Sequence, residues 1–232
     1  MSEPLELSAT PLFQNLSAAG LAEVLASARR FAMKGGETLF HQGSAADRVI
    51  VPLSGRVKLV QAADDGQLVV LRIVDHGEPL ALISVLQGSV FPATAQVMEP
   101  GVGVRIAGSA MRTLIDREPG IARNALPLLL GRLHEVQERY RELATERVER
   151  RIARVLIRLV RQSGEKVEGG VRIGMSLTRQ ELAEMSGTTL YTVSRVLSAW
   201  EHDGIVQSKR KQLLIKRPHG LVAIAEDFPE PG

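Results

Sequence analysis

The chain has 232 residues, of which 44% are hydrophobic and 24% charged, and it contains no cysteine. This composition is typical of a globular protein long enough for two domains, and the missing thiols exclude disulfides, zinc fingers and cysteine-held iron–sulfur clusters. The N-terminus lacks the basic and apolar regions of a signal peptide, and no apolar run reaches the length of a membrane span. We therefore expect a cytoplasmic protein with no membrane partner.

The net charge of +3 is unevenly distributed along the chain. Residues 147–218 hold 15 Lys and Arg against 7 Asp and Glu, a balance of +8, and the remaining residues have a balance of −5. A basic C-terminal third favours a polyanionic partner for that third. Charge also varies along chains without functional reason, so this interpretation needs a motif in the same region.

Short runs of Val, Ile and Leu separated by glycines fill residues 31–108, after a helix that we expect from Ser17 to about Arg30. Strand-length runs of this kind predict an antiparallel roll or barrel. Asp65 and Gly66 lie between VKLV and LVVL, which is a hairpin signal. Residues 1–118 are therefore expected to form a β-roll sensor domain with flanking helices.

A long helix is predicted for residues 119–144. Ser109 can cap a short helix before it, and Pro119 fits the first turn of the long one. Apolar side chains then recur at alternating spacings of three and four, with charges on both flanks, at Leu126, Leu129, Leu133, Val136, Tyr140 and Leu143. Such a heptad seam favours a homodimer over an amphipathic helix that only covers its own roll.

The C-terminal part, residues 145–232, opens with a hinge at about Ala144 to Arg147 and an amphipathic helix ended by Gly164. A hairpin is expected around Gly169 and Gly170. Thr178 then begins another helix, where Glu181 three residues later completes a capping box.

The stretch LTRQELAEMSGTTLYTVSRVLSAWEHDGIV fits a helix-turn-helix, with Gly187 at the turn and a basic hairpin tip, SKRKQ, behind it as in a winged helix. A plain helical hairpin explains the apolar spacing but not the glycine turn, the basic wing and the charge balance together. Arg195 can bond a guanine edge, and Tyr191 can face a base or a phosphate. The candidate DNA-binding residues are Thr178, Arg179, Thr188, Thr189, Leu190, Tyr191, Thr192, Ser194, Arg195, Lys209, Arg210 and Lys211.

This layout resembles the superfamily of the cyclic-AMP receptor protein and the fumarate–nitrate reduction regulator. The resemblance covers nearly the whole chain and rests on GETLFHQGSAADRVIVPLSGRVKL, RRIARVLIRL and the helix-turn-helix. It implies an α+β fold with an N-terminal cyclic-nucleotide-binding-like β-roll, a long dimerisation helix and a C-terminal winged helix-turn-helix. It also implies a dimeric transcription factor that binds two-fold symmetric double-stranded DNA, with RNA polymerase as a further candidate partner. A signal in the roll would re-orient the recognition helices.

The roll departs from the cyclic-nucleotide binders that it resembles. In those proteins an Arg-Ser-Ala run supplies the arginine that pairs with the cyclic phosphate. Here the arginine position falls at or near Pro92, and no Arg or Lys occurs between Arg72 and Arg105. A buried phosphate without a cation is poorly satisfied, so we expect a signal other than cyclic AMP. The candidate effector pocket consists of Gly77, Glu78, Leu80, Leu82, Pro92, Ala93 and Thr94.

The cofactor stays open. FPATAQV and the cysteine-free roll are closer to the nitric-oxide-responsive, denitrification-type branch, some of whose members are thought to use haem. Haem needs an axial ligand. The histidines that could provide this ligand are more typical of surface positions. These are His41, His76, His134, His202 and His219. An apolar effector, or none, is the alternative to haem.

Two other classes of function compete with DNA binding. A metal-dependent enzyme on a roll needs several converging histidines, whereas His41 and His76 are single and widely spaced. No nucleophile elbow or phosphate loop is visible, so we expect neither catalysis nor a metal site. A coiled-coil scaffold whose roll binds another protein would leave the basic winged segment without a purpose.

Overall fold

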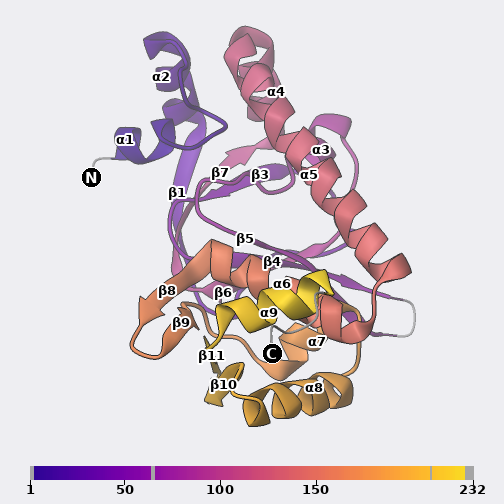
Figure 1. Ribbon diagram of the computed structural model, residues 1–232. Helices are drawn as coiled ribbons and strands as arrows, with labels where there is room; N and C mark the ends of the chain where they lie inside the picture. The colour runs from indigo at the N-terminus through magenta and orange to yellow at the C-terminus, as the bar shows by residue number, and fades with distance from the viewer. Residues whose placement is uncertain (1–2, 64–65, 210, 228–232) are drawn as a thin grey trace. The chain divides into compact units, whose positions relative to one another are not determined.

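The computed structural model describes residues 3–63, 66–209 and 211–227. The chain has an α+β fold and divides into two compact units, Met1–Glu135 and Val136–Gly232 (Figure 1). The helix α5 (Pro119–Thr145) crosses from the first unit into the second. The other elements of the first unit are α1 (Glu3–Ser8), α2 (Ala18–Ser27), β1 (Ala28–Met33), β2 (Thr38–Phe40), β3 (Arg48–Pro52), β4 (Arg56–Ala62), β5 (Leu68–Val74), α3 (Leu82–Gln87), β6 (Thr94–Glu99), β7 (Gly101–Ala107) and α4 (Gly108–Arg117).

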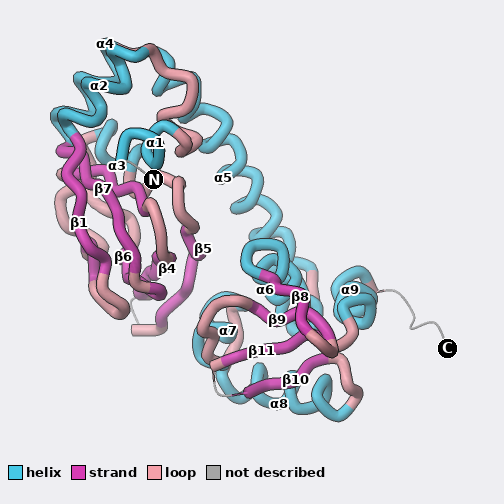
Figure 2. Tube along the Cα trace, turned by 90° about the vertical axis from the view of Figure 1, so that its left-hand side faces the viewer, coloured by secondary structure: helices cyan, strands magenta, loops and turns pink. Residues whose placement is uncertain are grey.

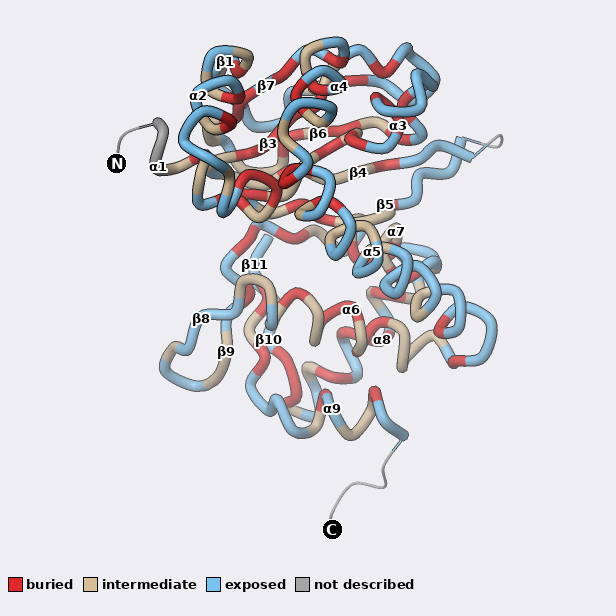
Figure 3. The backbone as a smooth tube through the Cα atoms, turned by 90° about the horizontal axis from the view of Figure 1, so that it is seen from above, coloured by how far each residue is buried: buried red, intermediate tan, exposed pale blue. Residues whose placement is uncertain are grey.

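Two antiparallel sheets form the predicted roll (Figure 2). One has the strand order β1-β7-β3 and the other β2-β6-β4-β5. Their facing side chains build a core in which the rings of Phe40 and Phe91 stack with their centroids 4.0 Å apart. Figure 3 colours the buried stretches of the backbone red, several of them along the strands of the roll. Leu80 is attached to the first sheet by backbone hydrogen bonds of 2.7 and 3.3 Å with Ile50.

The predicted hairpin in the roll is confirmed. Strand β4 pairs with β5 from Val57 opposite Val74 to Ala62 opposite Leu68. Gly66 has φ +81°, the left-handed backbone that a tight turn requires. Asp65 lies outside the described residues.

Two element boundaries differ from the sequence-based expectation. The first helix ends at Ser27 rather than near Arg30, because residues 28–33 pair with β7 as strand β1. Ser109 does not cap α4, which begins at Gly108 with Ala107 at the N-cap position. The Gly108 N–H donates to the Asp47 carbonyl at 2.7 Å, so contacts distant in sequence decide where this helix starts.

The second unit contains the helix-turn-helix and an antiparallel sheet of order β10-β11-β9-β8. Gly169, with φ +84°, turns the predicted β8–β9 hairpin, and β10 and β11 form the predicted wing. Helix α9 at the end of the chain was not predicted. The elements are α6 (Val148–Ser163), β8 (Gly164–Val167), β9 (Gly170–Ile173), α7 (Arg179–Ser186), α8 (Leu190–His202), β10 (Val206–Lys209), β11 (Gln212–Ile215) and α9 (Pro218–Glu226).

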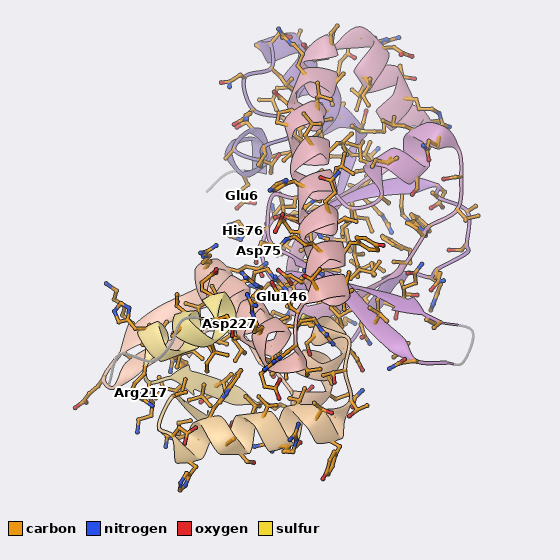
Figure 4. All side chains as sticks on the ribbon, turned by 45° about the vertical axis from the view of Figure 1, so that its right-hand side comes forward. Glu6, Asp75, His76, Glu146, Arg217 and Asp227 are labelled. Atoms are coloured by element: carbon orange, nitrogen blue, oxygen red, sulfur yellow. The ribbon has the colours of Figure 1, made fainter. Side chains whose placement is uncertain are left out.

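The break between α5 and α6 is lined by buried carboxylates. Helix α5 ends at Thr145, and Arg147 is extended before α6 begins. Glu142 accepts from Arg158 at 2.6 Å, and Glu146, labelled in Figure 4, accepts from Arg154 at 2.9 Å. Because buried carboxylates need such partners, these ion pairs tie the end of α5 to α6 inside the second unit.

Candidate DNA-binding surface and roll cavity

The turn between α7 and α8 has a defined backbone. Gly187 ends α7 in the left-handed region, with φ 62° and ψ 47°, as the sequence predicts. The guanidinium of Arg151, on α6, donates to the carbonyls of Ser186 at 3.1 Å and Gly187 at 3.2 Å. These hydrogen bonds satisfy helix-end carbonyls and hold the turn against α6.

Replacing Gly187 with alanine should destabilise the second unit by roughly 1–2 kcal/mol, because L-residues are strained in this region. The new Cβ would also lie 2.9 Å from a terminal methyl of Leu143. Thermal unfolding followed by circular dichroism measures the effect. Gly131→Ala is the matched control, since Gly131 is helical and, its own helix backbone and chain neighbours aside, no described atom lies within 4 Å of a Cβ there. Equal melting temperatures for the two variants would contradict the strain argument.

Helix α7 begins with the predicted capping box. The Thr178 hydroxyl accepts from the Glu181 N–H at 3.1 Å, and the Glu181 carboxylate accepts from the Thr178 N–H at 3.0 Å. Arg179 lies 3.8 Å from the Glu201 carboxylate. Both candidate DNA contacts on α7 therefore already have partners within the unit.

One face of helix α8 is buried and the other is exposed, as a recognition helix requires. Val193, Val196 and Leu197 are buried, whereas Leu190 is 47% and Tyr191 78% exposed. A tyrosine this exposed is free to meet an external partner through its ring or hydroxyl.

The N-terminus of α8 is capped by one of the two predicted threonines. The Thr189 hydroxyl accepts from the Thr192 N–H at 3.2 Å, whereas Thr188 does not cap the helix. Ser194 is half-buried on the same helix. Ser198, one turn later, is exposed on the same helix.

Arg195 projects from α8 with a side chain that is 65% exposed. Its nearest carboxylate is Glu149, at 3.8 Å, and an exposed ion pair of this length contributes little free energy. The guanidinium is therefore available to an outside acceptor. Lys209 and Lys211 are exposed at the wing, and Arg210 lies outside the described residues.

The first unit contains a partly open cavity of about 390 Å³. Leu80, Leu82, Pro92 and Ala93 line it, together with other apolar side chains from the roll and from α5. The remaining candidate pocket residues are not among the described residues that line it. Gly77 forms a turn with φ +84°, Thr94 accepts from the Gln42 N–H at 3.0 Å, and Glu78 accepts from Arg72 and Arg132.

The expectation that this region lacks cations is wrong for the cavity. Arg72 from β5 and Arg132 from α5 both line it, and both donate to the carboxylate of Glu78. Burial raises the pKa of the Glu78 carboxyl above its ordinary value, and Arg72 opposes that shift. The sequence does not indicate this pair, because Arg72 precedes the loop of candidate pocket residues and Arg132 has the position of a charged flank of the heptad seam.

Haem does not fit this cavity. The described residues that line it include no histidine, methionine or tyrosine that could bind the iron, and all five histidines are exposed. His76 is labelled beside Asp75 in Figure 4. Among the described residues there is also no cluster of His, Asp and Glu able to hold a metal ion.

The heptad residues of α5 are mostly solvent-exposed. Leu126, Leu133, Val136, Tyr140 and Leu143 are each more than half exposed. Leu129 instead lines the roll cavity, while Leu130 is 58% exposed and was not predicted. The other face of the helix is occupied, since Ile121 and Ala125 belong to the core of the roll. One helix thus covers its own roll and also presents an apolar stripe. None of the helices in the described part of the chain is long and apolar enough to span a bilayer.

Two protein-family models match the chain: the cyclic nucleotide-binding domain over residues 30–118 and the Crp-like helix-turn-helix domain over residues 150–224. The chain belongs to the CRP/FNR superfamily of transcriptional regulators. This CRP/FNR chain is therefore a DNA-binding transcriptional regulator.

Curated relatives match the chain in sequence over nearly their whole length. The chain is 29% identical to the cyclic AMP receptor protein of Thermus thermophilus, over 87% of this chain and 90% of that protein. It is 25% identical to the CRP-like cAMP-activated global transcriptional regulator of Mycobacterium tuberculosis, over 90% and 93%. The solved c-di-GMP responsive regulator CLP of Xanthomonas campestris matches in fold, with a TM-score of 0.76 and 22% identity, over 86% of this chain and 99% of that one.

Proposed function

We propose that this CRP/FNR regulator binds a two-fold symmetric DNA site as a homodimer and that its roll responds to a signal other than cyclic AMP. Residues 1–118 would sense the signal, residues 119–144 would form the dimer, and residues 145–232 would bind DNA. The exposed face of α8, with Tyr191 and Arg195 on it, carries the proposal. Helix α8 belongs to residues 147–218, whose net charge of +8 is complementary to the negative charge of a DNA backbone.

In this proposal α8 enters the major groove with its N-terminal half. Arg195 and Ser194 would contact base edges, and Tyr191 would contact a base or a phosphate. The exposed wing lysines, Lys209 and Lys211, would neutralise phosphates beside the groove. Activation would add RNA polymerase as a partner.

The chemistry of the cavity supports a signal other than cyclic AMP. Both arginines that reach the cavity are already paired with Glu78, so an incoming phosphate would have to displace a carboxylate. The lining is mostly apolar and offers few groups for ribose hydroxyls. Burying such hydroxyls without hydrogen bonds costs free energy.

Selection of DNA from a random pool by the purified full-length protein tests the proposal. We expect enrichment of two inverted half-sites whose centres lie about 10 base pairs apart, because two symmetric recognition helices meet successive major grooves. Adding cyclic AMP should leave the affinity for the selected site unchanged. Failure to enrich any site would reject sequence-selective binding, and a marked gain in affinity with cyclic AMP would reject the proposed signal class.

A further inference from the structure

The cavity of the roll has a strongly asymmetric chemistry. Most of its wall is apolar, with Phe40, Leu80 and Leu129 among the lining side chains. Its cationic groups are Arg72 and Arg132, which come from different elements and meet at the same carboxylate. Cavities of a few hundred Å³ with an apolar wall and a few convergent polar groups are typical of sites for small molecules.

The two arginines of the cavity already bind one carboxylate. Glu78 lies between the two guanidinium groups, and Arg132 also pairs with Glu135 at 3.2 Å. The Nε of Arg72 is buried without a hydrogen-bond partner among the described residues, so one donor is still unsatisfied. Two guanidinium groups with a spare donor can bind a second planar carboxylate in the same way.

Glu78 is placed so that it can leave this position. It follows Gly77, whose φ is +84°, and its side chain is 29% exposed, so water is close to it. Burial and the nearby carboxylates of Asp75 and Glu135 disfavour its charged form, while Arg72 favours it. Moving the Glu78 carboxylate into water would therefore relieve its desolvation cost, provided that another anion pairs with the two arginines.

We propose that the roll cavity binds a predominantly apolar carboxylic acid, whose carboxylate replaces that of Glu78 between Arg72 and Arg132. The exchange keeps the charge of the site constant, so burial of the apolar body of the ligand supplies the affinity. A phosphate monoester is a poorer replacement, since as a dianion it would change the net charge of a site in which Arg132 also pairs with Glu135. Because Arg132 lies on α5, the ligand would also take over the ion pair that joins α5 to the segment before α3.

The inference deepens the proposed function, since it assigns a chemical class to the signal of the roll. Isothermal titration of the full-length protein with hexanoate, octanoate and decanoate tests it. We expect saturable binding of one ligand per chain, with affinity rising by up to about fourfold per added methylene. Octanol and monooctyl phosphate, which match octanoate in length, should both bind more weakly than octanoate.

Variants separate the assigned site from unspecific uptake of an amphiphile. Arg72→Ala should weaken octanoate binding about 10- to 150-fold, the range for a lost hydrogen bond to a charged group. Glu78→Gln should strengthen it, because the competing carboxylate is gone. Arg105→Ala is the matched control, since Arg105 is exposed on β7 and does not line the cavity.

Several results would overturn the inference. These are octanol binding as tightly as octanoate, monooctyl phosphate binding more tightly, equal affinities for Arg72→Ala and Arg105→Ala, or no saturable binding of any alkanoate. The same preparations are tested on the selected DNA site. Selective DNA binding without octanoate binding rejects this inference alone, whereas octanoate binding without selective DNA binding rejects the proposed DNA function alone.

Discussion

Replacing Leu133 and Val136 together with glutamate is expected to convert the proposed homodimer to a monomer. Both side chains are more than half exposed in the single chain, at 55% and 63%, and lie on the heptad face of α5. Burying a leucine or valine contributes about 1.5–3 kcal/mol, and each change occurs twice in a two-fold dimer. The dissociation constant of the dimer should therefore rise at least about a hundredfold.

Sedimentation velocity at micromolar concentration measures this change directly. His134→Glu is the matched control, because His134 is exposed beside Leu133 on the same helix but is not one of the apolar residues of the heptad seam. Each monomer of the double variant should bind one half-site weakly, since two linked recognition helices gain affinity from their linkage. A double variant that sediments as a dimer would remove the α5 stripe as the dimer interface.

Replacing Arg195 with alanine should remove most of the selectivity for the preferred DNA site. A bidentate contact from arginine to guanine is worth about 1–3 kcal/mol of discrimination, and a dimer would make it once in each half-site. Affinity for the selected site should fall about a hundredfold or more, while affinity for unrelated DNA changes far less. Fluorescence anisotropy at fixed salt on both DNAs measures the ratio.

Two further variants define what Arg195 does. Arg195→Lys keeps the charge but loses the planar fork, so selectivity should still fall if the contact is bidentate. Arg161→Ala removes an exposed arginine of the same basic region that lies off α8, and it should leave selectivity intact. An equal loss on selected and unrelated DNA for Arg195→Ala would show that this side chain clamps a phosphate instead.

Much of the DNA-binding unit could be predicted from the sequence because its decisive interactions are local. The capping box joins Thr178 to a residue three positions later, and Thr189 caps α8 through Thr192. The turn after α7 needs a left-handed backbone at one residue, and Gly187 provides it. Such features depend on neighbours along the chain, so residue type and spacing are enough to find them.

The roll was harder, because its boundaries depend on partners far along the chain. Residues 28–30 have no local reason to leave a helix, but pairing with β7 makes them a strand. Leu129 fits the heptad as well as its neighbours do, yet it faces the cavity, and Leu130 takes an exposed position instead. The spacing of apolar residues indicates a helix face, whereas packing decides which part of that face is covered.

The sequence by itself determined the class of this protein: a glycine-punctuated roll, a heptad helix and a capped helix-turn-helix on a basic C-terminal region. These follow from periodicity and from hydrogen bonds that span a few residues. The tertiary structure alone decided the chemistry of the cavity, because Arg72, Glu78 and Arg132 meet only after a strand, a loop and a helix have packed together. Arg132 and Glu78 are 54 positions apart, and no local pattern brings such charges into contact.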